Sequence, residues 1–212
     1  MKKKHLKYIL ASAVLSGAAF SIKKVLEKSR QPEKIYLDFT GDYETDHWNP
    51  MDILKETENK NKTAKALSAI LLKVAEHRRD EYWKIKRDIL ASVILYADKS
   101  SDNTLMHVCD ILAEIASLGK KYDMNTLPKV CEPQWVLFEH LPYDVRQNLI
   151  ESIIVSLEKY DIDDYVELLQ KGDIRYKDFL LGKYDITIIE PNERPLLSEL
   201  FECMLIAFKD EL

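Results

Sequence analysis

The chain has 212 residues, of which 46% are hydrophobic and 32% charged, and its formal net charge is -5. This balance excludes a fibrous or mainly disordered chain, and 5 Gly with 7 Pro are too few turn formers for a many-stranded β-sandwich or barrel. The sequence therefore predicts a mainly helical protein that is long enough for one sizeable core.

Both ends of the chain resemble address signals. Residues 1–7 are basic and residues 8–20 form an apolar run ending in small side chains, as in a secretory signal peptide. The run is too short to span a membrane, which needs about 20 apolar residues. Residues 209–212 read KDEL, the endoplasmic-reticulum (ER) retrieval signal, and residues 61–63 form a glycosylation sequon. These signals keep one alternative open, a secreted or ER-luminal helical protein.

The first 54 residues have the pattern of α/β structure. The apolar run is followed by a helix-like stretch over residues 20–29 and by a strand over residues 35–38, which Gly41 ends. The Trp-Asn-Pro sequence at residues 48–50 predicts a loop, because the residue before a proline is kept out of the helical region. We expect the apolar run to stay attached and to pack as a buried strand and helix.

From Thr63 the periodicity becomes helical. Apolar residues recur at helical spacing in two successive stripes, which predict two antiparallel helices that pack face to face. The first stripe is Ala64, Leu67, Leu71, Val74 and Ala75, and the second is Trp83, Leu90, Val93, Ile94 and Ala97.

The rest of the chain continues as helices with one strand near the end. Asp102 or Asn103 can cap a third helix, which Gly119 terminates, and a loop follows through Pro128 and Pro133. Two further helices are predicted over residues 143–157 and 163–170, the second stopped by Gly172. A short strand over residues 185–189, a turn and a helix over residues 196–208 complete the chain.

The histidines, cysteines and acidic residues predict no catalytic or metal-binding residue. His107 and Cys109 are two apart and point in different directions on a helix, and no pair of the three cysteines has zinc spacing. An odd number of distant cysteines indicates reduced thiols. The acidic residues at 161–164 suit a helix start better than a calcium loop.

No cofactor is predicted either. Residues 16–21 lie between an apolar run and a helix, where a phosphate-binding loop would sit. Ala18 and Ala19 occupy the positions of the lysine that neutralises the phosphates and of the hydroxyl that binds magnesium. We therefore expect that the chain does not bind ATP usefully.

Read in order, these segments resemble the coupling ATPases of type IV secretion and conjugation, the TraG/TraD type. In that family a strand enters a phosphate loop, another strand ends in an Asp-Pro-Lys-Gly-Glu-like segment, an Asn-Pro-Leu loop follows, and an all-helical domain is inserted. Here the family's lysine and glutamate of the second motif are Thr40 and Asp42, and the chain ends before a Walker B strand. The matching segments are SGAAFS (16–21), LDFTGD (37–42), WNPMD (48–52), ILASVILYA (89–97), SIIVSLEKY (152–160), DITIIEP (185–191) and RPLLSELFECMLIAF (194–208).

The resemblance implies a helical bundle flanked by a small α/β remnant of a P-loop ATPase domain. Residues 1–54 would form a degenerate nucleotide-binding rim, residues 55–184 the all-helical domain, and residues 185–212 the strand and helix that return to the rim. It also implies a non-enzymatic interaction module without a transmembrane span, located in the cytoplasm or at the periphery of the inner membrane.

The resemblance implies a protein partner, namely a secretion substrate, a relaxase or a coupling ATPase. Residues 55–99 carry 11 basic and 7 acidic side chains, and such mixed signs suit an acidic protein surface better than a phosphate backbone. A nucleic-acid partner is the weaker alternative. We expect Arg78, Arg79 and Arg87 to contact the partner. They share the basic faces of the first two helices with Lys65, Lys73, Lys84 and Lys86.

Overall fold

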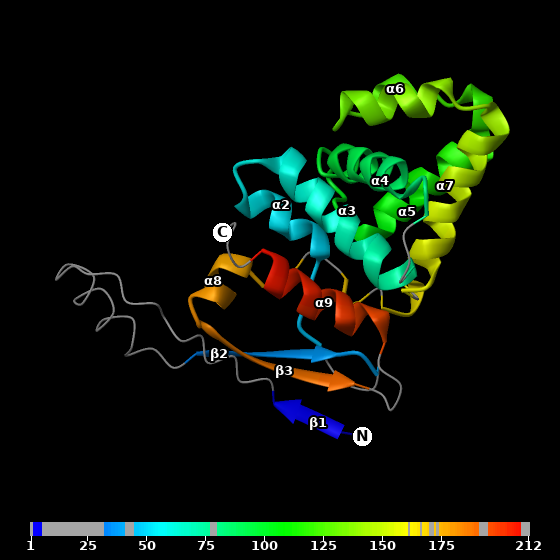
Figure 1. The fold of residues 1–212 in the computed structure, drawn as a ribbon. Helices are drawn as coiled ribbons and strands as arrows, with labels where there is room; N and C mark the ends of the chain where they lie inside the picture. Colours follow the sequence, from blue (N-terminus) through cyan, green and yellow to red (C-terminus); the bar gives the residue numbers. More distant parts are fainter. Residues whose placement is uncertain are drawn as a thin grey trace.

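A small sheet and a larger group of helices make up the described part of the chain, seen in the computed structural model (Figure 1). The description covers residues 2–5, 32–40, 45–76, 80–160, 162–165, 167–169, 172, 174–190 and 195–208. The strands are β1 (Lys2–His5), β2 (Glu33–Asp38) and β3 (Tyr184–Glu190). The α-helices are α2 (Ile53–Glu56), α3 (Lys60–Glu76), α4 (Trp83–Ala97), α5 (Leu105–Leu118), α6 (Glu132–His140), α7 (Tyr143–Glu158), α8 (Tyr176–Leu180) and α9 (Leu196–Ala207). The short 3-10 helices are η1 (Pro50–Asp52), η2 (Gly119–Lys121), η3 (Met124–Thr126) and η4 (Ile162–Tyr165). The prediction of a mainly helical protein is confirmed.

The sheet has the strand order β1-β3-β2. β3 runs antiparallel to β1 and parallel to β2, where Ile35 lies opposite Ile186 and Leu37 opposite Ile188. All four side chains are buried, because alternate residues of a strand face the same side of the sheet. The strands predicted from residues 35–38 and 185–189 are therefore confirmed, whereas the Lys-Lys-Lys-His sequence of β1 shows no strand pattern.

Helix α9 lies between the sheet and the other helices and packs against α3 (Figure 1). Phe201 on α9 meets Trp48 edge-on, with ring centroids 5.0 Å apart. The indole Nε1 of Trp48 donates a hydrogen bond of 2.7 Å to the Tyr176 hydroxyl on α8. Trp48 is fully buried, so the predicted loop at residues 48–50 supplies an anchor that joins α8 and α9.

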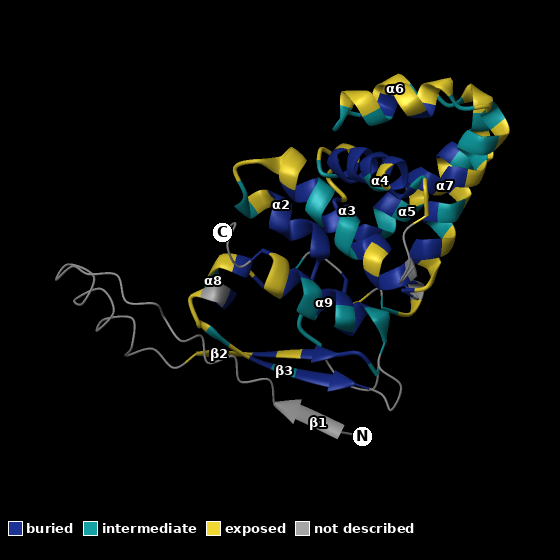
Figure 2. Ribbon diagram, in the orientation of Figure 1, coloured by how far each residue is buried: buried dark blue, intermediate teal, exposed yellow. Residues whose placement is uncertain are grey.

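Helices α3 and α4 pack against each other through the two predicted apolar stripes. Leu67 and Leu71 on α3 and Leu90 and Val93 on α4 have no exposed surface. Figure 2 shows that buried positions concentrate in α4, β2 and β3, whereas α6 is mostly exposed. The hydroxyl of Tyr160 donates a hydrogen bond of 2.6 Å to the Leu71 carbonyl and ties the end of α7 to α3.

The predicted end of helix α5 is confirmed, whereas its predicted N-cap is wrong. Gly119 follows the last turn with a φ of 54°, a conformation that glycine adopts easily. The N-cap is Thr104, whose hydroxyl oxygen accepts from the backbone N–H of His107 over 3.2 Å. Asp102, one of the two predicted caps, instead accepts from the Thr104 hydroxyl through its carboxylate.

The loop predicted through Pro128 and Pro133 is wrong over its second half. Pro133 lies in the first turn of α6, where a proline is tolerated because that backbone N–H has no intrahelical partner. Trp135 and Phe138 on this helix are buried, and α6 packs over α4. Their burial stabilises a helix that the local pattern does not indicate.

The helix predicted over residues 163–170 is also wrong. The described residues there form η4 and, beyond it, turns. The carbonyl of Leu168 accepts from the backbone N–H of Trp48 over 2.7 Å, so it bonds to a distant segment. Gly172, predicted to stop that helix, donates its N–H to the Asp52 carboxylate over 3.0 Å.

Several predicted features lie outside the described residues. They are the apolar run at residues 8–20, the degenerate phosphate loop at residues 16–21, the helix-like stretch at residues 20–29, Gly41 and Asp42, and the KDEL sequence at residues 209–212.

Candidate functional site

Of the three arginines predicted to bind a partner, the structure describes only Arg87. Arg78 and Arg79 lie outside the described residues. Arg87 binds Asp88, with its Nη2 2.7 Å from the carboxylate Oδ1, and its guanidinium carbon lies 5.7 Å from the ring centroid of Trp83. Its side chain is 24% exposed. Arg87 therefore has intramolecular contacts, and its contact with a partner stays a prediction.

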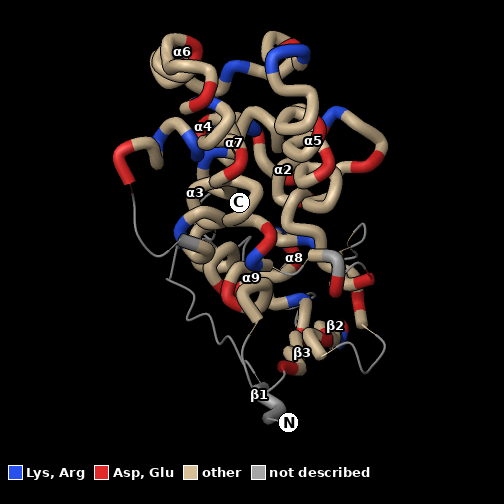
Figure 3. Tube along the Cα trace, turned by 90° about the vertical axis from the view of Figure 1, so that its right-hand side faces the viewer, with Lys and Arg blue, Asp and Glu red and all other residues tan. Residues whose placement is uncertain are grey.

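The expectation that Lys86 lies on an exposed basic face is wrong. It is 2% exposed, and its Nζ lies 3.0 Å from an Asp80 carboxylate oxygen and 3.4 Å from the Ser152 hydroxyl on α7. Lys86 thus links the segment before α4 to α7, and at this burial it is not accessible to a partner. Figure 3 shows the remaining Lys and Arg positions interspersed with Asp and Glu over the helices.

Two buried carboxylates stand at the carboxyl ends of the parallel strands β2 and β3, where α/β folds often place a ligand. Asp38 accepts from the Thr40 backbone N–H over 2.9 Å and from its hydroxyl over 2.7 Å. Glu190 accepts from the Ser198 hydroxyl in the first turn of α9. These local hydrogen bonds hold the chain where it leaves the sheet.

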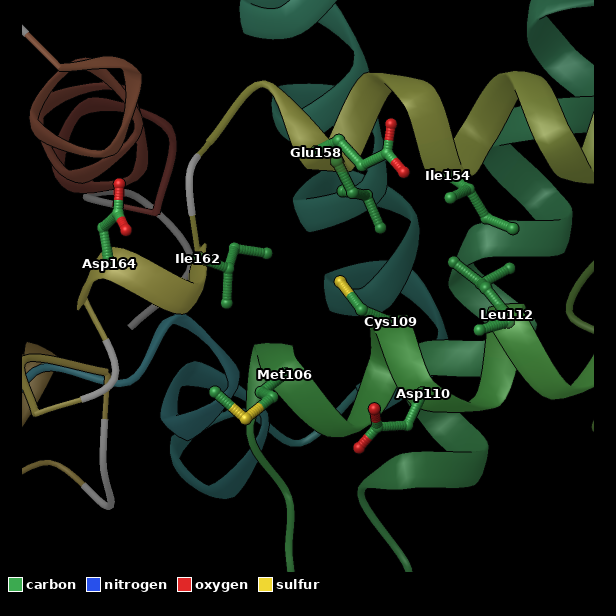
Figure 4. A pocket seen from close by; sticks show the side chains of 10 residues that line it. Met106, Cys109, Asp110, Leu112, Ile154, Glu158, Ile162 and Asp164 are labelled. Carbon is green, nitrogen blue, oxygen red and sulfur yellow. The ribbon is translucent and has the colours of Figure 1, made fainter.

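A hollow with a volume of about 420 Å³ lies between the antiparallel helices α5 and α7. We call it the α5/α7 groove. Leu112, Leu157 and Ile162 are buried at its base, and Met106, Cys109 and Ile154 are half-buried along it. In Figure 4 the side chain of Cys109 points from α5 toward α7, and Ile162 lies on η4 beside the ends of the two helices. The groove therefore offers a continuous apolar base.

Three exposed carboxylates stand at the rim of the α5/α7 groove. They are Asp110 on α5, Glu158 at the end of α7 and Asp164 on η4. Figure 4 shows Asp110 on α5, directed away from α7, and Glu158 on α7, so the two come from opposite sides of the groove. Within the described part of the chain, none of the three forms a side-chain hydrogen bond or ion pair, and no Lys or Arg lines the groove.

The groove follows from a second stripe on α5. Val108, Leu112 and Ile115 face the core, whereas Met106, Cys109 and Ala113 recur at helical spacing beside that stripe. Sequence reasoning missed the groove, although this second stripe beside Asp110 was its signal. The stripe does not reveal which helix lies opposite, and so it could not identify the groove by itself.

The cysteines and other possible ligands indicate no metal or redox centre in the described residues. Cys109, Cys131 and Cys203 form no disulfide. No group of three or more His, Cys, Asp or Glu among the described residues could hold a metal ion. Of the helices that are described, none is both long and apolar enough to cross a membrane.

The fold and the groove define a mainly helical protein with a small mixed sheet and an acidic-rimmed apolar groove. No family model, curated protein or solved structure matches the chain.

Proposed function

We propose that this chain is a non-enzymatic interaction module, related to the coupling proteins of type IV secretion and conjugation, that captures a protein partner. The observation that carries the proposal is the α5/α7 groove, with its apolar base and carboxylates on both sides. The resemblance of the ordered segments supports the family and a cytoplasmic location, and it names three partner classes: a secretion substrate, a relaxase or a coupling ATPase.

The occupant that fits the groove is a basic amphipathic helix of the partner. An apolar stripe on such a helix would cover Cys109 and Ile154, and the burial of apolar surface would drive association. Lysines or arginines flanking the stripe would reach Asp110 and Glu158 on the two sides. A nucleic acid does not fit here, because exposed carboxylates repel phosphates.

A defined peptide tests this assignment. The probe is a fluorescent, helix-forming peptide with a leucine stripe flanked by lysines, and the control peptide has glutamates in place of the lysines. We expect fluorescence anisotropy to show binding of the basic peptide only. The variant Asp110→Lys/Glu158→Lys should weaken it by at least about tenfold, which corresponds to about 1.4 kcal/mol.

The control is Glu114→Lys, which makes on α5, outside the groove, the same charge change as Asp110→Lys alone and half that of the double variant. It should leave the affinity nearly unchanged, because an exposed charge away from the contact acts mainly through screened long-range fields. Binding of the acidic peptide, or equal losses in the control and the double variant, would refute the groove as the binding site.

The predicted face with Arg78, Arg79 and Arg87 is a separate contact for an acidic protein surface. We propose testing it with Arg78→Glu/Arg79→Glu, which leaves the Arg87–Asp88 pair intact. The variant should bind the groove peptide normally and bind the intact partner less tightly, as measured by calorimetry. Unchanged affinity for that partner would show that this face is only a solvated surface.

A further inference from the structure

A second, smaller hollow lies at the opposite end of the same two helices. Its volume is about 150 Å³, and we call it the Arg146 pocket. α5 and the η2 turn contribute Ile115 and Lys120, and α7 contributes Tyr143 and Arg146. Phe138 of α6 closes another side. These elements are held together by Gln147, whose Nε2 donates to the Ala116 carbonyl over 3.0 Å.

The turn at Gly119 shapes this pocket. Its φ of +54° is rare for residues with a side chain, and a Cβ at this position would collide with the Tyr143 hydroxyl. Glycine therefore lets η2 approach the start of α7 closely. This approach brings the Lys120 Nζ to 4.7 Å from the centroid of the Tyr143 ring.

Two cations border the pocket without a carboxylate partner in the described chain. Lys120 contacts the ring of Tyr143, and the Arg146 guanidinium carbon lies 5.9 Å from the centroid of the Phe138 ring. The Arg146 Nε is buried and has no hydrogen-bond partner among the described residues. The lining of the pocket contains no Asp or Glu. An orphaned buried N–H of this kind indicates an absent acceptor, because such groups in folded proteins are nearly always paired.

We propose that the Arg146 pocket binds a carboxylate attached to an apolar group of side-chain size. The guanidinium presents a planar fork of donors that matches a carboxylate, and Lys120 adds a second positive charge. Ile115, Phe138 and Ile150 supply an apolar wall for the attached group. A volume of about 150 Å³ suits a single side chain.

A carboxylate attached to an apolar group can belong to a free organic acid or to the C-terminal residue of a peptide. The probes are N-acetyl-phenylalanine and a short peptide ending in phenylalanine with a free carboxylate. Each is paired with its amide, which keeps the shape and removes the charge. We expect protein-observed NMR titrations to show that each carboxylate that binds does so at least about tenfold more tightly than its amide. Binding of the free acid alone identifies a small acid, and binding of the peptide identifies a chain end.

Variants show whether the carboxylate meets the inferred residues. Arg146→Lys keeps the charge but removes the fork, and we expect a loss of about tenfold or more in affinity. Lys120→Gln should weaken binding several-fold, whereas Lys121→Gln, on the neighbouring exposed lysine outside the lining, should not. Near-UV circular dichroism confirms that each variant is folded.

Three results would overturn the inference. They are equal affinity for the acid and its amide, unchanged affinity in Arg146→Lys, and binding of inorganic phosphate as tightly as the best carboxylate. The pocket does not share its lining with the α5/α7 groove, so failure here and failure of the proposed function are separate outcomes.

Discussion

The two ends of the α5/α7 pair share an architecture and differ in charge. At one end the half-buried side chains of Met106 and Cys109 lie beside carboxylates, and at the other end Ile115 lies beside Lys120 and Arg146. The apolar contact between the helices is common to both. The difference shows that the packing of the helices creates the hollows, whereas a few surface residues at each end determine what each hollow can bind.

Helix electrostatics does not explain these charges. Glu158 is the last residue of α7 and Arg146 lies in its first turn, so both stand where the helix dipole disfavours their sign. Stability alone would favour the opposite arrangement. Both residues are therefore slightly unfavourable for the helix, which agrees with the binding roles that we propose for them.

The largest effect is expected at the cationic end, from Gly119→Ala. The substitution forces a side chain into a positive φ and against the Tyr143 hydroxyl, and we expect a loss of about 2 kcal/mol or more in the free energy of unfolding. Urea unfolding measures it. The control is Gly182→Ala, where φ is also positive, +69°, but nothing lies within 4 Å of the added Cβ. Equal losses of stability would show that only the positive φ at Gly119 matters, and not the close approach of Tyr143.

A pH-dependent effect is expected near the acidic end, where Tyr160 follows α7. Burial raises the pKa of Tyr160 above its ordinary value of 10.0, and it does the same for Tyr176 on α8. Above pH 10 the unfolded chain loses these phenolic protons while the folded chain keeps them. Stability should therefore fall as the pH rises, by about 1.4 kcal/mol per pH unit for each tyrosine.

The variants Tyr160→Phe and Tyr176→Phe separate the two contributions. Each keeps the ring and removes the titrating hydroxyl, so each should flatten the fall in stability above pH 10 by the share of one tyrosine. Urea unfolding at a series of pH values measures the slope. A slope that neither variant changes would mean that other groups cause the alkaline instability.

The smallest effect is expected from Glu158→Gln at the acidic end. Removing a negative charge from the last residue of α7 should raise the free energy of unfolding by about 0.3 to 1 kcal/mol while weakening the basic peptide. Glu114→Gln, in the interior of α5, should change neither quantity appreciably. If Glu158→Gln lowers the stability instead, the carboxylate stabilises the fold. Its unfavourable position at the end of the helix would then no longer support a binding role.

Local patterns in the sequence were sufficient where one helix face alone determines the structure. The stripes that begin at Ala64 and Trp83 predicted α3 and α4 and placed Trp83 in the core, where it is 6% exposed. Gly119 marked the end of α5 correctly. These features depend on periodicity and backbone preference, which are properties of neighbouring residues.

Tertiary structure decided the features that depend on distant segments. The backbone N–H of Trp48 donates to the Leu168 carbonyl, and this segment forms turns where a helix was predicted. The packing of α6 on α4 stabilises a helix where two prolines indicated a loop. Asp80 and Ser152 similarly surround Lys86, a residue that spacing placed on the surface. The two hollows belong to the same class, because each needs the antiparallel pairing of α5 with α7. A sequence pattern specifies which face of a helix is apolar, but only the folded chain determines which surface that face meets.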